Sequence, residues 1–165
     1  MREKIFRTGL GQDSHRFFKK NTSKPCIIGG VLFENVLGFL ANSDGDVIFH
    51  AICNAISSLT GVLILGNIAD KLCKNDGITD SSVYVKTALK YLKNQKIEHI
   101  AISLEGKKPI FIDKIDQMKN SISKVLNIDS KKIGITATSG EGLTEFGLGV
   151  GVNCLCIVTT SEEIY

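Results

Sequence analysis

The 165-residue chain has no tryptophan, only two prolines and little excess of either charge. Its 20 basic and 17 acidic side chains leave a net charge of +3, and the lysines are spread along the sequence. A nucleic-acid surface usually needs a concentrated basic patch, and none is indicated here. No apolar run reaches the roughly 20 residues that cross a bilayer. We therefore expect a soluble protein that binds neither nucleic acid nor membrane, with a single domain over residues 1–165.

The five cysteines include no C-x-x-C pair, and no signal-peptide-like segment opens the sequence. Their number and spacing argue against a disulfide framework and predict a reducing, cytoplasmic setting. Cys154 and Cys156 lie two apart in an apolar run. In a strand both thiols would point to one face, which predicts buried structural cysteines and not metal ligands.

Hydrophobic periodicity predicts a mixed order of strands and helices. Strands are expected at Ile5–Phe17, Ile97–Glu105, Ile133–Thr138 and Val152–Thr159, with a hairpin at Pro25–Glu34. Helices are expected from Ser43 to about Leu59, from Asp80 to about Gln95 and from about Lys114 to Leu126. Val62–Leu72 is apolar but interrupted, and Lys74–Gly77 is expected to be a turn or mobile loop. This order predicts an α+β fold in which helices cover one face of a mixed β-sheet, as a ferredoxin-like α/β sandwich.

The densest chemistry lies in the segment Asn42–Asn54. Ser43 is the expected helix N-cap, and the acidic residues after it suit the positive end of the helix dipole. Asp46, His50 and Asn54 fall at i, i+4 and i+8, on one helical face. A histidine beside polar groups near a helix N-terminus can hold a metal ion or help to bind an anion.

Asp13 and His15 lie two apart in the first expected strand, so both side chains point to the same side and can chelate one cation. Alone, such a pair is more often an unliganded surface pair. With His50 it completes two imidazoles and one carboxylate, a catalytic type of zinc set that leaves a fourth position for substrate or water.

A glycine-rich loop follows the third main strand. Ser139, Gly140 and Gly142 could offer backbone N–H groups to a phosphate, and Glu141 could bind a hard cation such as Mg²⁺. An ordinary turn explains the same glycines. His99 has no partner nearby in the sequence and is expected on the surface.

Three segments, in matching order, resemble the 2-C-methyl-D-erythritol 2,4-cyclodiphosphate synthases of the non-mevalonate isoprenoid route. They are G-x-D-S-H at Gly11–His15, S-D-G-D-V-x-x-H-A at Ser43–Ala51, and A-T-S-G-E-G-L at Ala137–Leu143. The resemblance covers essentially the whole chain, and the second motif is the most specific of the three.

The resemblance implies that the chain cyclises 4-diphosphocytidyl-2-C-methyl-D-erythritol 2-phosphate with release of CMP, as a phosphorus–oxygen lyase. It implies a homotrimer with active sites between adjacent subunits, one Zn²⁺ per subunit on Asp13, His15 and His50, and Mg²⁺ (or Mn²⁺) on Glu141. The residues expected to act in catalysis are Asn42, Ser43 and Ser139. Those expected to contact substrate are Asp13, Ser43, Gly106, Ile110, Ile112, Ala137, Thr138 and Ser139.

The chain departs from the family pattern at several positions. Asn42 stands where many members have histidine, Ile110 where lysine is common, and Asn67 where aspartate is expected. Leu148 and Val150 replace an arginine and a glutamate that, in the family, line a central cavity associated with isoprenoid diphosphates. Two other hypotheses therefore stay open: a trimeric metal-stabilised binding or scaffold protein that releases no CMP, and a metal-dependent phosphohydrolase that forms a linear product.

Overall fold

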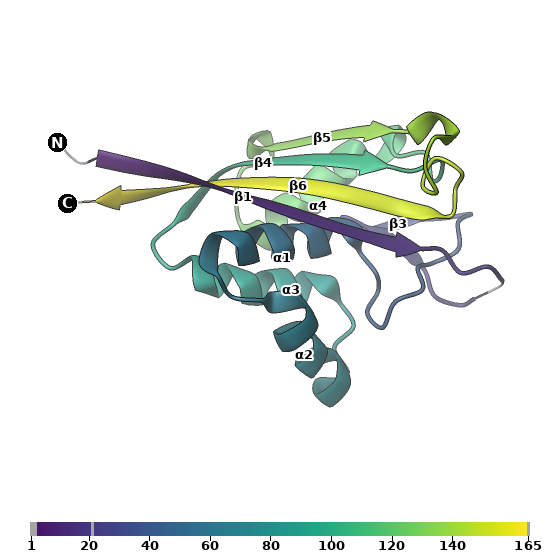
Figure 1. Ribbon diagram of the computed structural model, residues 1–165, viewed down its shortest axis with the longest axis horizontal. Helices are drawn as coiled ribbons and strands as arrows, with labels where there is room; N and C mark the ends of the chain where they lie inside the picture. The colour runs from purple at the N-terminus through teal and green to yellow at the C-terminus, as the bar shows by residue number, and fades with distance from the viewer. Residues whose placement is uncertain (1–2, 21, 165) are drawn as a thin grey trace.

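The computed structural model describes residues 3–20 and 22–164 (Figure 1). Its main sheet contains β1 (Glu3–Arg16), β4 (Lys96–Glu105), β5 (Ile133–Thr138) and β6 (Gly151–Ile164), in the spatial order β1-β6-β4-β5. The β1–β6 and β4–β6 pairs are antiparallel and the β4–β5 pair is parallel. A separate hairpin joins β2 (Cys26–Ile28) to β3 (Val31–Phe33). The expected mixed sheet is confirmed.

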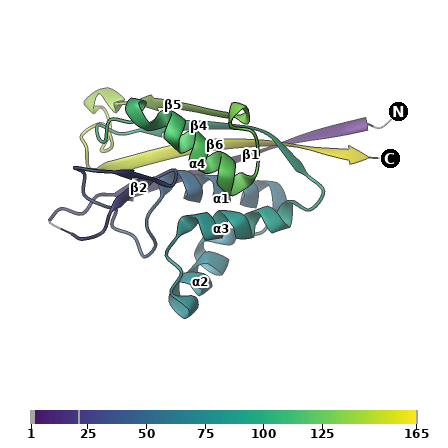
Figure 2. The ribbon, with the colours of Figure 1, turned by 180° about the vertical axis from the view of Figure 1, so that it is seen from behind.

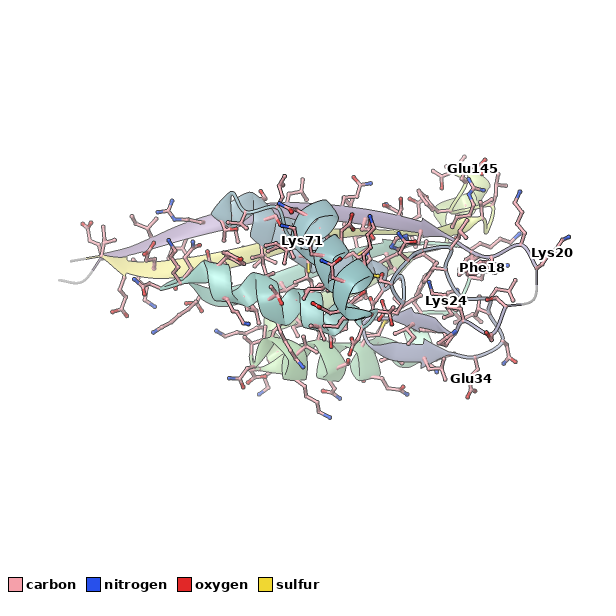
Figure 3. The ribbon with its side chains drawn as sticks, turned by 90° about the horizontal axis from the view of Figure 1, so that it is seen from below. Phe18, Lys20, Lys24, Glu34, Lys71 and Glu145 are labelled. Atoms are coloured by element: carbon pink, nitrogen blue, oxygen red, sulfur yellow. The ribbon has the colours of Figure 1, made fainter. Side chains whose placement is uncertain are left out.

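The helices α1 (Val47–Thr60), α3 (Ser81–Leu89) and α4 (Ile115–Leu126) lie on one side of this sheet (Figures 1 and 2). Helix α1 packs directly on β1 and β6, and α3 packs on α1 and α4. Helix α2 (Ala69–Asp76) extends away from the layer, and in the view from the helix side it carries Lys71 in front of the sheet (Figure 3). Short helical turns occupy Ile64–Ile68, Lys90–Leu92, Ile112–Lys114, Ser130–Lys132 and Gly140–Gly142.

The expected ferredoxin-like connectivity is wrong. That arrangement runs β-α-β-β-α-β, whereas the four strands of the main sheet here follow the order β-α-β-α-β-β. The difference places the parallel strand pair at the edge of the sheet and β6 between β1 and β4. As a result, β1 pairs only with the last strand of the sheet.

Two helix boundaries also differ from the expectation. Helix α1 begins at Val47 with Asp46 as its N-cap, so Ser43 does not cap it, although Gly61 ends it as a left-handed C-cap (φ 73°). The segment expected to be an interrupted apolar run and loop contains α2. Helix α3 ends at Leu89, earlier than expected, and continues only as a short turn.

Close contact between β1 and α1 fixes the two elements that carry the candidate ligands. A Cβ atom built on Gly9 would lie 2.2 Å from the Ala55 carbonyl oxygen, and one on Gly11 would lie 2.0 Å from the Ala51 carbonyl oxygen. Any side chain at these positions would collide with the helix backbone. Glycine therefore lets β1 lie directly on α1.

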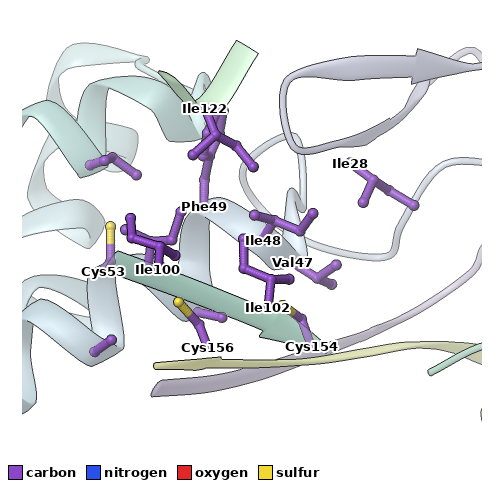
Figure 4. Close-up of a cluster of buried hydrophobic side chains, with 14 of the residues drawn as sticks. Ile28, Val47, Ile48, Phe49, Cys53, Ile100, Ile102, Ile122, Cys154 and Cys156 are labelled. Atoms are coloured by element: carbon purple, nitrogen blue, oxygen red, sulfur yellow. The ribbon is translucent and has the colours of Figure 1, made fainter. Parts of the chain in front are cut away.

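The core lies between the sheet and the helices (Figure 4). Cys154 and Cys156 of β6 are fully buried, as expected. All five cysteines are free thiols, and the cytoplasmic setting inferred from them stays a prediction. His99 is exposed, as expected.

The other face of the sheet carries exposed apolar side chains. Phe6 and Leu10 of β1 are 62% and 59% exposed, and Leu155 and Ile157 of β6 are 39% and 41% exposed. Leu10, Leu155 and Ile157 line one shallow hollow with residues of β4 and β5. Among the described residues no single helix is long and apolar enough to span a membrane; only α1 together with Ile64–Asp76, a pair bent by 94°, meets that test by length and composition.

Candidate metal centre

Asp13, His15 and His50 meet at one point, as the sequence predicted. Asp13 Oδ2 lies 3.0 Å from His15 Nε2 and 3.0 Å from His50 Nδ1, and the two nitrogens are 3.0 Å apart. Asp13 and His15 come from alternate positions of β1, so both point toward α1. His50 comes from the first turn of α1, where it is buried.

The donor set fits a metal ion. In a tetrahedral site with bonds of about 2.0–2.1 Å, neighbouring ligand atoms lie about 3.3 Å apart, close to the spacing of this triangle. Two imidazole nitrogens and a carboxylate oxygen facing one another repel unless protons or a cation lie between them. The three residues could therefore hold a divalent cation, and all three line one cleft of the structure.

The charge of Asp13 suits this role. Burial alone raises the pKa of its carboxyl, but the hydrogen bonds and charges of His15 and His50 outweigh that effect and lower the pKa to about 2. The carboxylate is thus ionised at any pH near neutrality.

The expected catalytic residues Asn42 and Ser43 border the same cleft, which also contains Leu65, Asp70, Cys73 and Tyr84. Ser43 is buried, and its Oγ lies 3.2 Å from His50 Nε2 and accepts a hydrogen bond from the Gly45 N–H. Asn42 is exposed. The segment from Leu65 to Cys73, which includes most of α2, forms one wall of the cleft.

The remaining predicted residues form a second group at the ends of β4 and β5. Gly106 donates its N–H to the Thr138 carbonyl at 3.0 Å, and Ser139 Oγ donates to Glu141 Oε1 at 3.1 Å. Ala137 is exposed, and Ile110 and Ile112 are 70% and 71% exposed. None of the five main cavities formed by the described residues contains members of both groups. Within one subunit the structure does not bring them together in a single pocket.

The family model of the YgbB family matches residues 6–161. The chain belongs to the YgbB family. A relative from Chlamydia caviae, 2-C-methyl-D-erythritol 2,4-cyclodiphosphate synthase, is 58% identical over 159 residues, which cover 96% of this YgbB chain and 90% of the relative.

Solved structures agree with this placement. The structure titled IspF CDP complex from Plasmodium falciparum has 30% identity and a TM-score of 0.79, and the match covers 95% of this YgbB chain and 96% of that chain. The bifunctional IspDF from Campylobacter jejuni has 25% identity and a TM-score of 0.87 over 97% of this chain. The present chain spans 43% of that bifunctional protein.

Sequence reasoning missed Ser81, which contacts the candidate ligand His50 of this YgbB chain from behind. Ser81 Oγ lies 2.9 Å from His50 Nε2, and the Ser81 hydroxyl donates to Asp44. The sequence indicated only a helix start near residue 80. Nothing local marked Ser81, because its partners lie 31 and 37 residues away along the chain.

Proposed function

We propose that this protein is a 2-C-methyl-D-erythritol 2,4-cyclodiphosphate synthase, which cyclises 4-diphosphocytidyl-2-C-methyl-D-erythritol 2-phosphate to 2-C-methyl-D-erythritol 2,4-cyclodiphosphate with release of CMP, in isoprenoid precursor biosynthesis. The observation that carries the proposal is the convergence of Asp13, His15 and His50 beside Ser43. It occurs in a chain that is 58% identical to a curated synthase over nearly its full length.

We further propose one Zn²⁺ on Asp13, His15 and His50, and Mg²⁺ (or Mn²⁺) on Glu141. The donor sets support this choice, since zinc accepts imidazole and carboxylate whereas magnesium prefers oxygen. When bound, the ions neutralise phosphate charge and polarise the phosphorus–oxygen bonds. Asp13 and the two imidazoles would hold this cation where they line the cleft, and the cation would supply positive charge to a phosphate bound there.

The reaction needs no side-chain nucleophile. An oxygen of the 2-phosphate attacks the β-phosphorus of the same substrate molecule. The bond from that phosphorus to the CMP oxygen breaks, and CMP leaves with the electron pair. The chain's task is to hold two mutually repelling phosphates in line. The Ser43 hydroxyl and the Asn42 amide, which both border the cleft, would donate hydrogen bonds to phosphate oxygens.

The nucleotide would bind to the second group of residues, supplied by a neighbouring subunit of a homotrimer. These residues are Gly106, Ile110, Ile112, Ala137, Thr138 and Ser139. Their separation from the metal cleft within one chain supports a site shared between subunits. The exposed apolar face of the sheet supports self-association, because contiguous apolar patches usually mark interfaces.

Phosphorus NMR of the purified protein with the proposed substrate, Zn²⁺ and Mg²⁺ tests the function. We expect CMP and a cyclic diphosphate to appear with the wild type, to be lost in Asp13→Ala and to persist in Asp116→Ala, which removes an exposed carboxylate of α4. Substrate binding without CMP release would contradict the proposal in favour of a binding protein. A linear product, identified by its mass, would indicate a phosphohydrolase.

A further inference from the structure

We infer that Ser81 and Asp44 form a hydrogen-bond relay that fixes the proton of His50 on Nε2 and leaves Nδ1 free to bind a metal ion. Ser81 is thus a positioning residue that acts through His50. The inference rests on the metal site proposed above and concerns what holds one of its ligands in the binding form.

Ser81 lies behind the candidate ligands and does not line the cleft, whereas Asp44 borders a neighbouring cavity. Ser81 is the first residue of α3 and is fully buried. Its Oγ is 2.9 Å from His50 Nε2, and its hydroxyl donates to Asp44 Oδ1. The same aspartate is held in place, because its Oδ2 accepts the Ser81 N–H at 3.1 Å and its own N–H donates to the Thr79 carbonyl at 2.8 Å.

The direction of the hydrogen bonds follows from counting protons. A serine hydroxyl has one proton, and an ionised carboxylate can only accept. Since the Ser81 proton goes to Asp44, the Ser81 oxygen can only accept from His50. Nε2 of His50 must then carry the proton, and its Nδ1, which faces Asp13 and His15, offers a lone pair. His50 must adopt this tautomer to bind a metal ion through Nδ1.

The Ser43 hydroxyl also lies near His50 Nε2, but its surroundings differ from those of the Ser81 hydroxyl. It lies 3.2 Å from Nε2, borders the cleft and has no carboxylate behind it. With the Nε2 proton in place, the Ser43 oxygen accepts from Gly45 N–H and His50, and its own proton has no acceptor among residues 3–20 and 22–164. Ser81 therefore orients the imidazole, while the Ser43 proton stays available for a substrate anion.

The test compares zinc-loaded Ser81→Ala with Ser82→Ala. Ser82 is the next residue of α3, and its side chain makes no contact with His50 that parallels the Ser81 bond. We expect Ser81→Ala to weaken zinc binding by about 10- to 100-fold, measured by competition with a chromophoric chelator, and Ser82→Ala to leave it unchanged.

Nitrogen-15 NMR of histidine-labelled protein gives a readout that a general loss of stability would not mimic. The chain has three histidines, so the signals can be assigned by substitution. We expect a slowly exchanging Nε2–H of His50 in the wild type and in Ser82→Ala, and its fast exchange in Ser81→Ala. Asp44→Asn is a second variant. A carboxamide can donate a hydrogen bond to the Ser81 oxygen, so the Ser81 hydroxyl proton would no longer be required to point at residue 44. We expect zinc binding to be weaker in this variant too.

Folded Ser81→Ala with wild-type zinc affinity and an unchanged His50 signal would overturn the relay. If Ser81→Ala does not fold, unchanged zinc affinity in Asp44→Asn overturns it instead. The metal site itself is tested separately by Asp13→Ala. If Asp13→Ala binds zinc as the wild type does, the proposed metal site is wrong. If Asp13→Ala loses zinc but Ser81→Ala binds it normally, only the relay is wrong.

Discussion

The charge of Asp13 depends strongly on its neighbours. Its carboxyl has a pKa lowered to about 2, from an ordinary value of 3.8, because His15 and His50 outweigh the effect of burial. A carboxyl whose pKa falls on folding stabilises the folded state above its unfolded pKa, and this contribution disappears as the pH drops through the folded pKa. In the metal-free protein the stabilisation is therefore complete above about pH 5 and declines toward pH 2.

Substituting Asp13→Asn in the metal-free protein should lower the free energy of unfolding by about 2 kcal/mol at pH 6 and by about 1 kcal/mol at pH 3. Urea titrations at the two pH values measure the difference. Asp116→Asn, at an exposed position, is the control and should follow the wild type at both. An Asp13→Asn penalty that does not shrink in acid would show that the carboxylate charge is not what stabilises the cluster.

At the scale of elements, the start of α1 depends on Asp46. Its buried carboxylate accepts from the N–H groups of Ile48 and Phe49 in α1 and of Gly29 and Gly30 in the hairpin turn. Burial raises its pKa to about 6, although these donors oppose the rise. One side chain thus joins the first turn of the ligand-bearing helix to the β2–β3 hairpin.

Two N-caps can be compared directly. Asp46→Ala should destabilise the protein by about 3 kcal/mol or more, because it leaves several buried N–H groups without acceptors. Asp80→Ala should cost only about 1 kcal/mol, because the exposed Asp80 caps α3 through the Ser82 N–H alone. Thermal and urea unfolding provide both values. Equal losses would contradict the role of Asp46 in joining two elements.

Sequence reasoning succeeded where the signal is local and failed where it is tertiary. The period of two in β1 and the position of His50 near a helix start were enough to predict the ligand cluster. Serine and aspartate are both common N-caps, so the sequence alone does not decide whether Ser43 or Asp46 caps α1. In the structure the Asp46 carboxylate also accepts hydrogen bonds from Gly29 and Gly30, which holds it at the helix start. Helix α2 was missed because Gly66, with φ 80°, interrupts the apolar run before it and most of its residues are polar.

At the scale of the whole molecule, the exposed apolar face of the sheet should become buried on assembly. If the proposed trimer forms through this face, Leu155→Asp should convert it into a monomer of 17.9 kDa, measured by light scattering after gel filtration. The variant should also lose turnover, because each proposed site would lose its neighbouring subunit. Leu63→Asp is the control, since Leu63 is 71% exposed but lies between α1 and the turn at Ile64–Ile68, off the sheet. A wild type that is already monomeric, or a Leu155→Asp variant that stays trimeric, would count against this interface.

The pairing of β1 with β6 has a consequence for synthesis on the ribosome. Asp13, His15 and His50 all emerge within the first third of the chain, yet β1 has no strand partner until residues 151–164 follow. A nascent chain can therefore form α1 early, but its two β1 ligands stay on an unpaired strand. The ligand cluster can therefore assemble only after β6 has been synthesised, so a truncated chain lacking β6 would contain every ligand without forming the site.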